Sequence, residues 1–211
     1  FTVVIDTNVL AGGLVRNALL HLAEAGFFRP RWSERIIDEL QRTLAKRGKS
    51  SEYTSRLVGA MQRAFPEAWV EGWEVYMSLK PGLPDPDDNH VLAAAIRCDA
   101  AVIVTENLRD FPSNVLGRYS TQPISSDAFL ADTIDLSQRE ACAALARMRQ
   151  GFNNPPGLQS GWSTASRNSG FARRRHSCDR PSMIFERSGY RHRISIDGSG
   201  EGVPDRGLLR R

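Results

Sequence analysis

The 211-residue sequence predicts an α/β fold in which helices cover both faces of a central parallel β-sheet. Two observations support this prediction. Residues 100–104, "AAVIV", are apolar at every position, as in strands that are buried on both faces of a parallel sheet. Strand-like segments also alternate with segments of helical periodicity over residues 1–150, which is the pattern of a doubly wound sheet.

Local patterns predict the individual elements. The first strand is expected at residues 2–5, where all four residues favour extended structure. A helix is expected at 8–25, loosened near its start by the "AGG" at 11–13. Ser33 is a favourable N-cap for a second helix. The apolar stripe of that helix consists of Ile36, Ile37, Leu40 and Leu44. Further strands are expected at 28–32, 100–104 and 122–125, and further helices at 51–65, 67–78, 127–133 and 137–150.

Charge is distributed unevenly along the chain. Residues 1–150 hold 17 Lys and Arg against 19 Asp and Glu, a net charge of −2. Residues 151–211 hold 11 against 5, a net charge of +6. The overall basic excess therefore belongs to the tail and gives no evidence for a basic patch on the globular part.

Composition changes from residue 157 onward. Arg, Ser and Gly supply 28 of the last 55 residues, whereas Leu, Ile, Val and Phe supply nine, a share below the ~20% level associated with disorder. We therefore expect a folded domain at 1–135, a short helical extension at 136–156 and a disordered tail at 157–211.

The tail is open to two interpretations. Of the 28 basic residues in the chain 25 are Arg, and the tail has no Lys. The tail is either an arginine-rich arm that binds RNA phosphates or an out-of-frame extension in a GC-rich gene. The abrupt loss of helical pattern favours the second interpretation.

Several protein classes lack support in the sequence. The three cysteines form no CxxC and the four histidines show no zinc spacing, which favours a reduced, cytoplasmic protein without a structural metal knot. No apolar run is long enough to span a membrane. Phosphate-binding loops of the GxxxxGK[ST] and GxGxxG types are absent. An aspartyl-phosphate phosphatase needs a second acid two residues after the first, and Asn8 stands there.

Polar and acidic residues follow two of the expected strands. Asp6 comes directly after the strand at 2–5, and Glu106 with Asn107 follows the strand at 100–104. Because the carboxyl ends of parallel strands share one edge of a sheet, we expect these side chains to lie together. Burying a carboxylate is unfavourable unless something compensates, so Asp6 needs a compensating partner.

Helical phase selects another acid in the helix after Pro84. Asp85 is the expected N-cap, with a proline in the favoured first-turn position. The apolar stripe of this helix consists of Val91, Leu92, Ala95 and Ile96. Asp88 falls near the centre of that stripe and Asp87 lies well off it, so we expect Asp88 to point inward.

Glu39 and Asp110 are further candidates for the same edge. Glu39 lies at the edge of the apolar stripe of its helix, and Asp110 follows the strand at 100–104 closely enough to fold back over the sheet. Carboxylates that converge repel one another and raise at least one pKa. A divalent cation that prefers hard oxygen ligands, Mg²⁺ or Mn²⁺, removes this conflict. Such an ion is our hypothesis for what compensates the burial of Asp6.

Four stretches of the chain resemble the acidic motifs of the PIN-domain nucleases, and most of all those of the VapC-like toxins of bacterial toxin–antitoxin pairs. They are "VVIDTNVL", "SERIIDEL", "DPDDNHVLAAAI" and "AVIVTENLRDF", in that order over about residues 2–130. The resemblance implies a PIN-like α/β/α sandwich, a Mg²⁺- or Mn²⁺-dependent ribonuclease, and inhibition by a cognate antitoxin.

The resemblance also implies roles for individual residues. The active-site and metal-binding acids become Asp6, Glu39, Asp88 and Asp110, and the polar supports become Thr7, Asn8 and Thr105. Many relatives carry an acid where Asn107 stands, and the pattern "T-x-N-x-x-D-F" moves the fourth role to Asp110. In the implied hydrolysis, water attacks the phosphate and leaves a 3′-hydroxyl and a 5′-phosphate.

Simpler interpretations exist for several of these residues. The sequence Asp6-Thr7-Asn8 can cap a helix, Glu39 can be a solvated helix residue, and Asp110 can be a turn residue. His90 lies opposite the apolar stripe of its helix and is expected to be exposed. Trp69, Trp73 and Tyr76 have helical spacing and are expected in the core or an interface.

A different class of function stays open, namely a catalytically silent module on the same fold that binds RNA or a partner protein. Converging carboxylates argue against it, because binding alone does not need them. The expected partners are an RNA substrate and an antitoxin. We expect the helices at 8–25 and 33–78 to form the surface for antitoxin docking and for a possible homodimer.

Overall fold

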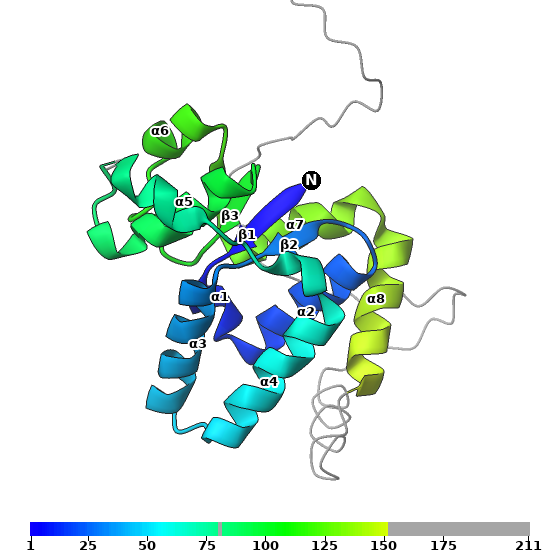
Figure 1. The fold of residues 1–211 in the computed structure, drawn as a ribbon. Coiled ribbons are helices and arrows are strands. Elements are labelled where there is room, and N and C mark those ends of the chain that lie inside the picture. The colour runs from blue at the N-terminus through cyan, green and yellow to red at the C-terminus, as the bar shows by residue number, and fades with distance from the viewer. Residues whose placement is uncertain (80–81, 152–211) are drawn as a thin grey trace, which may run out of the picture. The chain divides into compact units, whose positions relative to one another are not determined.

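The computed structural model describes residues 1–79 and 82–151 (Figure 1). Its centre is a sheet of four parallel strands in the order β2-β1-β3-β4. The strands are β1 (Thr2–Ile5), β2 (Arg29–Arg31), β3 (Val102–Val104) and β4 (Gln122–Ile124). The predicted α/β fold with a central parallel sheet is confirmed.

The register of the two middle strands fixes the position of the first acid. Val3 pairs with Val102 and Ile5 with Val104, and all four side chains are buried. The backbone N–H of Asp6 continues this ladder by donating to the carbonyl of Val104 at 3.0 Å. Asp6 and the residue after Val104 therefore emerge side by side at the carboxyl edge of the sheet.

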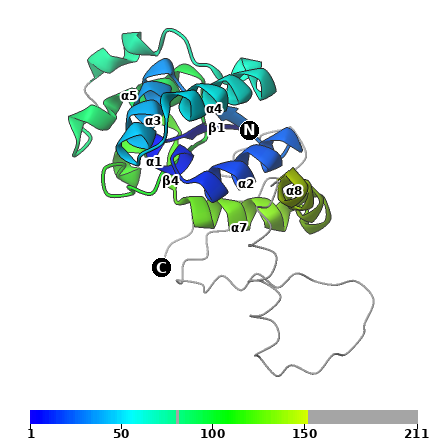
Figure 2. The ribbon, with the colours of Figure 1, turned by 90° about the horizontal axis from the view of Figure 1, so that it is seen from below.

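Helices form a layer on each side of the sheet. Figure 2 shows α3 (Glu34–Lys46), α4 (Ser51–Ala64) and α5 (Asn89–Arg97) on one side of β1, and α2 (Gly13–Glu24), α7 (Ser126–Leu136) and α8 (Gln138–Gly151) on the other. Ser33 caps α3 as predicted, because its Oγ accepts a hydrogen bond from the N–H of Ile36 at 3.3 Å. The predicted apolar stripe of α3 is buried.

The helix predicted at 8–25 consists of two helices. The single turn α1 (Thr7–Leu10) is followed by α2, which starts at Gly13. The chain is tight between them: a Cβ atom at Gly12 would lie 3.2 Å from the carbonyl oxygen of Val9. The glycines that were expected to loosen the helix therefore allow the change of direction after α1.

The helix predicted at 67–78 is wrong. The segment forms two 3₁₀ helices, η1 (Pro66–Ala68) and η2 (Trp73–Leu79). Between them Val70 donates to the carbonyl of Trp32 and Trp32 donates to the carbonyl of Ala68, so the chain runs extended beside the end of β2. Gly72 then adopts φ +70°, a left-handed conformation that interrupts any helix. Backbone pairing and this glycine override the helical spacing of the aromatic residues.

The remaining elements are short. They are η3 (Pro86–Asp88), α6 (Ser113–Leu116) and η4 (Gly117–Tyr119). In α8, Ala141 and Ala144 are fully buried in the same core as the sheet. No helix of residues 1–79 and 82–151 is long and apolar enough to cross a membrane. The proposed domain boundaries stay predictions, and the tail at 157–211 lies outside the described residues.

Candidate active site

Asp6 is almost fully buried, with 5% of its surface exposed, and it is surrounded by hydrogen-bond donors. Its Oδ1 accepts from the backbone N–H of Thr7 at 2.6 Å, which caps helix α1. Its Oδ2 accepts from Asn8 Nδ2 at 2.7 Å and from Thr105 Oγ1 at 2.8 Å. Thus Thr7, Asn8 and Thr105, which the resemblance suggested as polar supports, all donate hydrogen bonds to Asp6.

These hydrogen bonds offset only part of the cost of burial. Burial raises the pKa of Asp6, and the hydrogen bonds from Thr105 and Thr7 lower it by less. The pKa of Asp6 is therefore raised overall, which means that the ionised carboxylate is still destabilised in this structure. A nearby cation would relieve that remaining cost.

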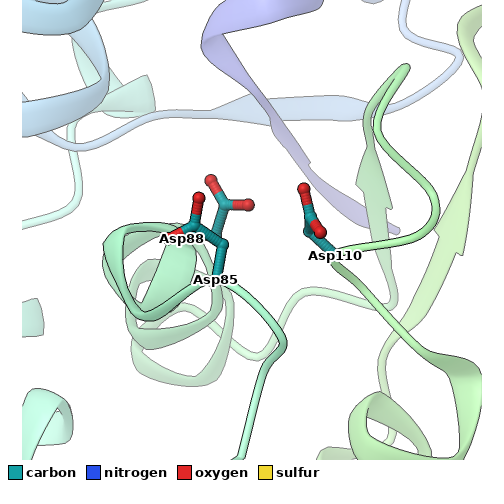
Figure 3. Close-up of side chains that lie close together, drawn as sticks. All are labelled: Asp85, Asp88 and Asp110. Atoms are coloured by element: carbon teal, nitrogen blue, oxygen red, sulfur yellow. The ribbon is translucent and has the colours of Figure 1, made fainter.

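Three other carboxylates lie close together, and one of them, Asp88, is close enough to Asp6 to be affected by its charge. Asp85 and Asp88 come from the segment that leads into α5, and Asp110 comes from the loop after β3 (Figure 3). One carboxylate oxygen from each lies within 4.8 Å of the others. Asp110 is held in place by a hydrogen bond from Asn107 Nδ2 to its Oδ2. We call Asp85, Asp88 and Asp110 the acidic cluster.

Asp88 is the most perturbed member of the acidic cluster. Burial raises its pKa first, and the negative charges of Asp6, Asp85 and Asp110 raise it further, to about 6. Its Oδ2 is buried and has no hydrogen-bond partner among the described residues. A buried, unpartnered acceptor among negative charges matches the requirements of a divalent-cation ligand. The acidic cluster therefore fits a divalent metal ion.

This raised pKa predicts that metal-free protein loses stability as the pH rises. Because the native state binds the Asp88 proton more tightly than the unfolded state does, stability falls between about pH 4, the usual pKa of an aspartate, and about pH 6. The full pKa difference corresponds to ~3 kcal/mol, and solvent screening of this half-exposed group reduces it to about 1 kcal/mol. Urea denaturation in EDTA at pH 4.5 and pH 7 should therefore show that Asp88→Asn gains stability over the wild type at the higher pH. An equal difference at both pH values would contradict the prediction.

Glu39 lies next to this site but is bonded differently. Its Oε2 accepts from Thr7 Oγ1 at 3.2 Å, and its Oε1 lies 3.0 Å from His90 Nε2. Burial acts to raise the pKa of Glu39, but the hydrogen bond and charge of His90, with smaller contributions from Thr7 and Arg35, outweigh it and lower the pKa. Glu39 is therefore ionised at neutral pH.

The predicted exposure of His90 is wrong, since only 1% of its surface is exposed. Its ring lies edge-on to Trp73, with 6.2 Å between the ring centroids. Helical phase correctly placed His90 away from the sheet. It could not reveal that η2 and α3 cover that side of α5 as well, because those contacts come from segments distant in the sequence.

The loop after β3 connects the site to the rest of the fold. The N–H of Glu106 donates to Asn8 Oδ1 at 3.1 Å, and Thr105 Oγ1 accepts from the N–H of Asn107 at 3.1 Å. The side chain of Glu106 in turn accepts a hydrogen bond from the hydroxyl of Ser126, at the start of α7. The loop that carries Asp110 is thus fixed from both α1 and α7.

Sequence reasoning missed three contributors to the site. Asp85 caps the 3₁₀ helix η3 instead of α5, whose N-cap position is Asp88. Its side chain accepts from the N–H of Asp87 at 2.9 Å, and it also joins the acidic cluster. Asn107 was noted as a substitution for an acid, and its role in holding Asp110 was not predicted. His90 was placed in solvent. The "DPDD" repeat of acids offered a signal for Asp85, whereas no local pattern pointed to His90.

Comparisons with known proteins give two family matches and one relative. A PIN-domain family model matches residues 2–109, and a VapC50 C-terminal domain model matches residues 126–157. The protein named "Putative ribonuclease VapC50" of Mycobacterium tuberculosis H37Rv is 42% identical over 69 residues, which are 33% of this chain and 41% of that protein. No matching solved structure was found.

The first of these matches covers about half of the chain, from β1 to the loop after β3. It therefore includes Asp6, Glu39 and Asp88 together with the sheet edge that brings them close. The chain belongs to the PIN-domain family and is similar to the protein named "Putative ribonuclease VapC50".

Proposed function

We propose that this protein is a divalent-metal-dependent endoribonuclease that hydrolyses RNA phosphodiester bonds, and that it is the toxin of a toxin–antitoxin pair. The observation that carries the proposal is the buried Oδ2 of Asp88, which lacks a partner within the described part of the chain and lies among Asp6, Asp85 and Asp110. The name of the VapC50 relative, a ribonuclease, supports the choice of RNA as substrate.

The residues that would hold the ion are Asp88 and Asp110, with Asp85 beside them and Asp6 adjoining. Carboxylate oxygens are hard ligands, and this set suits Mg²⁺ or Mn²⁺ better than softer metals. When bound, such an ion stabilises the negative charge that builds on the scissile phosphate and acidifies water.

The protein's own groups would prepare the site for that chemistry. Three donors fix Asp6 in one orientation, so its carboxylate needs no reorganisation during the reaction. Thr7 links Asp6 to Glu39, because its N–H donates to the first and its hydroxyl to the second. Glu39 is ionised, so it can accept a hydrogen bond from water beside the acidic cluster.

The direct test is cleavage of a mixed RNA pool by the purified full chain. We expect cutting with Mg²⁺ or Mn²⁺, no cutting with EDTA, and products that end in a 3′-hydroxyl and a 5′-phosphate. End-labelling of the products distinguishes these ends from a 2′,3′-cyclic phosphate, which would exclude the proposed attack by water. Mn²⁺ binding by a folded protein that cuts none of a diverse set of RNAs would instead favour the silent binding module.

We also propose that the helices of residues 7–64 form the antitoxin docking and dimer surface. On these helices Leu14 is 67% exposed and Tyr53 is 36% exposed, although both are large apolar residues. Coexpression with a cognate antitoxin should give a complex that copurifies. Purification of the chain alone under those conditions would contradict this proposal.

A further inference from the structure

His90 and Glu39 form a row of contacts behind Asp6. His90 Nε2 lies 3.0 Å from Glu39 Oε1, and Thr7 Oγ1 donates to Glu39 Oε2 at 3.2 Å. The backbone N–H of the same threonine donates to Asp6 Oδ1 at 2.6 Å. Thr7 Oγ1 also lies 3.1 Å from the carbonyl oxygen of Ile36, so its one hydrogen is shared between that acceptor and Glu39. A row of hydrogen-bond contacts therefore leads from His90 through Glu39 and Thr7 to Asp6.

The direction of the first hydrogen bond follows from chemistry. A glutamate carboxylate at neutral pH can only accept, so the hydrogen in the 3.0 Å contact between Glu39 and His90 is on Nε2. The other ring nitrogen, Nδ1, is buried and has no partner among residues 1–79 and 82–151. Among the described residues, His90 therefore reaches the site through the hydrogen bond from its Nε2 to Glu39.

The two arginines near Glu39 do not replace this contact. Arg35 Nε lies 3.5 Å from Glu39 Oε1 and Arg42 lies 4.0 Å from it, but their side chains are 40% and 66% exposed. Such exposed ion pairs contribute little and are screened by salt. His90 is 1% exposed, so its contact with Glu39 is screened by solvent less than the two arginine contacts are.

We propose that His90 is a positioning residue of this site: its Nε2–H fixes the Glu39 carboxylate, and through Thr7 it fixes Asp6, beside Asp88. The turn before α5 and α5 itself therefore each contribute one residue to the site. The turn contributes Asp88, and α5 contributes His90, which donates to Glu39. This inference rests on the proposed function as a metal-dependent nuclease.

The test compares two amides at the same position. The side-chain nitrogen of glutamine reaches about as far as Nε2 of histidine, whereas that of asparagine reaches only as far as Nδ1. His90→Gln can therefore keep the bond to Glu39, and His90→Asn cannot. We expect His90→Gln to stay within about 3-fold of the wild type. For His90→Asn we expect a Kd for Mn²⁺ that rises about 10-fold and a kcat for RNA cleavage that falls about 10- to 100-fold, with KM for RNA little changed.

A second comparison shows whether His90 acts through Glu39. In a Glu39→Ala background, His90→Asn should cause no further loss, because the acceptor of the His90 hydrogen bond is already removed. Thermal denaturation of each variant establishes that it is folded. Equal behaviour of His90→Gln and His90→Asn, or a full additional loss in the Glu39→Ala background, would overturn the positioning role.

The Mn²⁺ measurements separate this inference from the proposed function. A wild-type protein that binds Mn²⁺ but cuts no RNA would overturn the nuclease activity, and the Kd values of the two His90 variants would still decide the positioning role. A wild-type protein that does not bind Mn²⁺ would overturn both.

Discussion

Replacing Asp88 with asparagine is expected to reduce metal-dependent RNA cleavage by about 1,000-fold or more. The change removes the charge of the one carboxylate whose buried oxygen lacks a partner in the described structure and lies among three other acids. Losing a metal ligand removes several kcal/mol of transition-state stabilisation, and ~4 kcal/mol corresponds to this factor. Single-turnover cleavage of one RNA at saturating Mg²⁺ measures the effect directly.

The neighbouring Asp87 provides a matched control. It is exposed, it carries the same charge and it lies outside the acidic cluster. Asp87→Asn changes the net charge of the protein by the same amount as Asp88→Asn. It also keeps the hydrogen bond from the backbone N–H of residue 87 to Asp85. We expect it to cut RNA within about 2-fold of the wild type. Equal losses in the two variants would show that overall charge, rather than a ligand at Asp88, explains the effect.

Asp6→Asn is expected to abolish both cleavage and the stabilisation of the protein by metal. In the wild type, Mn²⁺ at 100 times its Kd should add about 2.7 kcal/mol to the free energy of unfolding. The variant should show little of this gain, because the asparagine amide lacks the negative charge. Urea denaturation with Mn²⁺ and with EDTA measures both values.

Without metal, Asp6→Asn should change stability only slightly. Removing a charge that burial disfavours is stabilising, and losing an acceptor that serves Asn8 and Thr105 is destabilising, so the two effects oppose each other. The same Mn²⁺-dependent gain in the variant and the wild type would show that Asp6 does not take part in metal binding.

The sequence was informative wherever short-range periodicity decides the position of a side chain. The apolar runs at 2–5 and 100–104 predicted parallel neighbours, and their register places Asp6 beside Thr105. Helical phase separated Asp88 from Asp87. The position of Asp6 follows from the direction in which parallel strands run. The inward position of Asp88 follows from the periodicity of a single segment.

Sequence reasoning failed where contacts between segments far apart in the chain decide whether a residue is buried or helical. His90 faces away from the sheet, as its phase predicted, but η2 and α3 cover it. Trp69 and Trp73 have helical spacing, yet pairing of the chain with Trp32 and the left-handed Gly72 set their backbone. These contacts join segments far apart in the sequence, so no window of the chain could show them.

The hydrogen bond between Ser126 and Glu106 has a consequence for how the protein can be divided. The PIN-domain match ends at residue 109 and the VapC50 C-terminal match begins at residue 126, so this bond joins the two matched regions. Through Glu106 and Asn8 it leads to Asp6. A protein truncated to the first region would keep every candidate acid except Asp110. It would lose the hydrogen bond from Ser126 to Glu106 that holds the loop after β3. We therefore predict that the PIN-domain region and the helices that follow it unfold together as one cooperative unit.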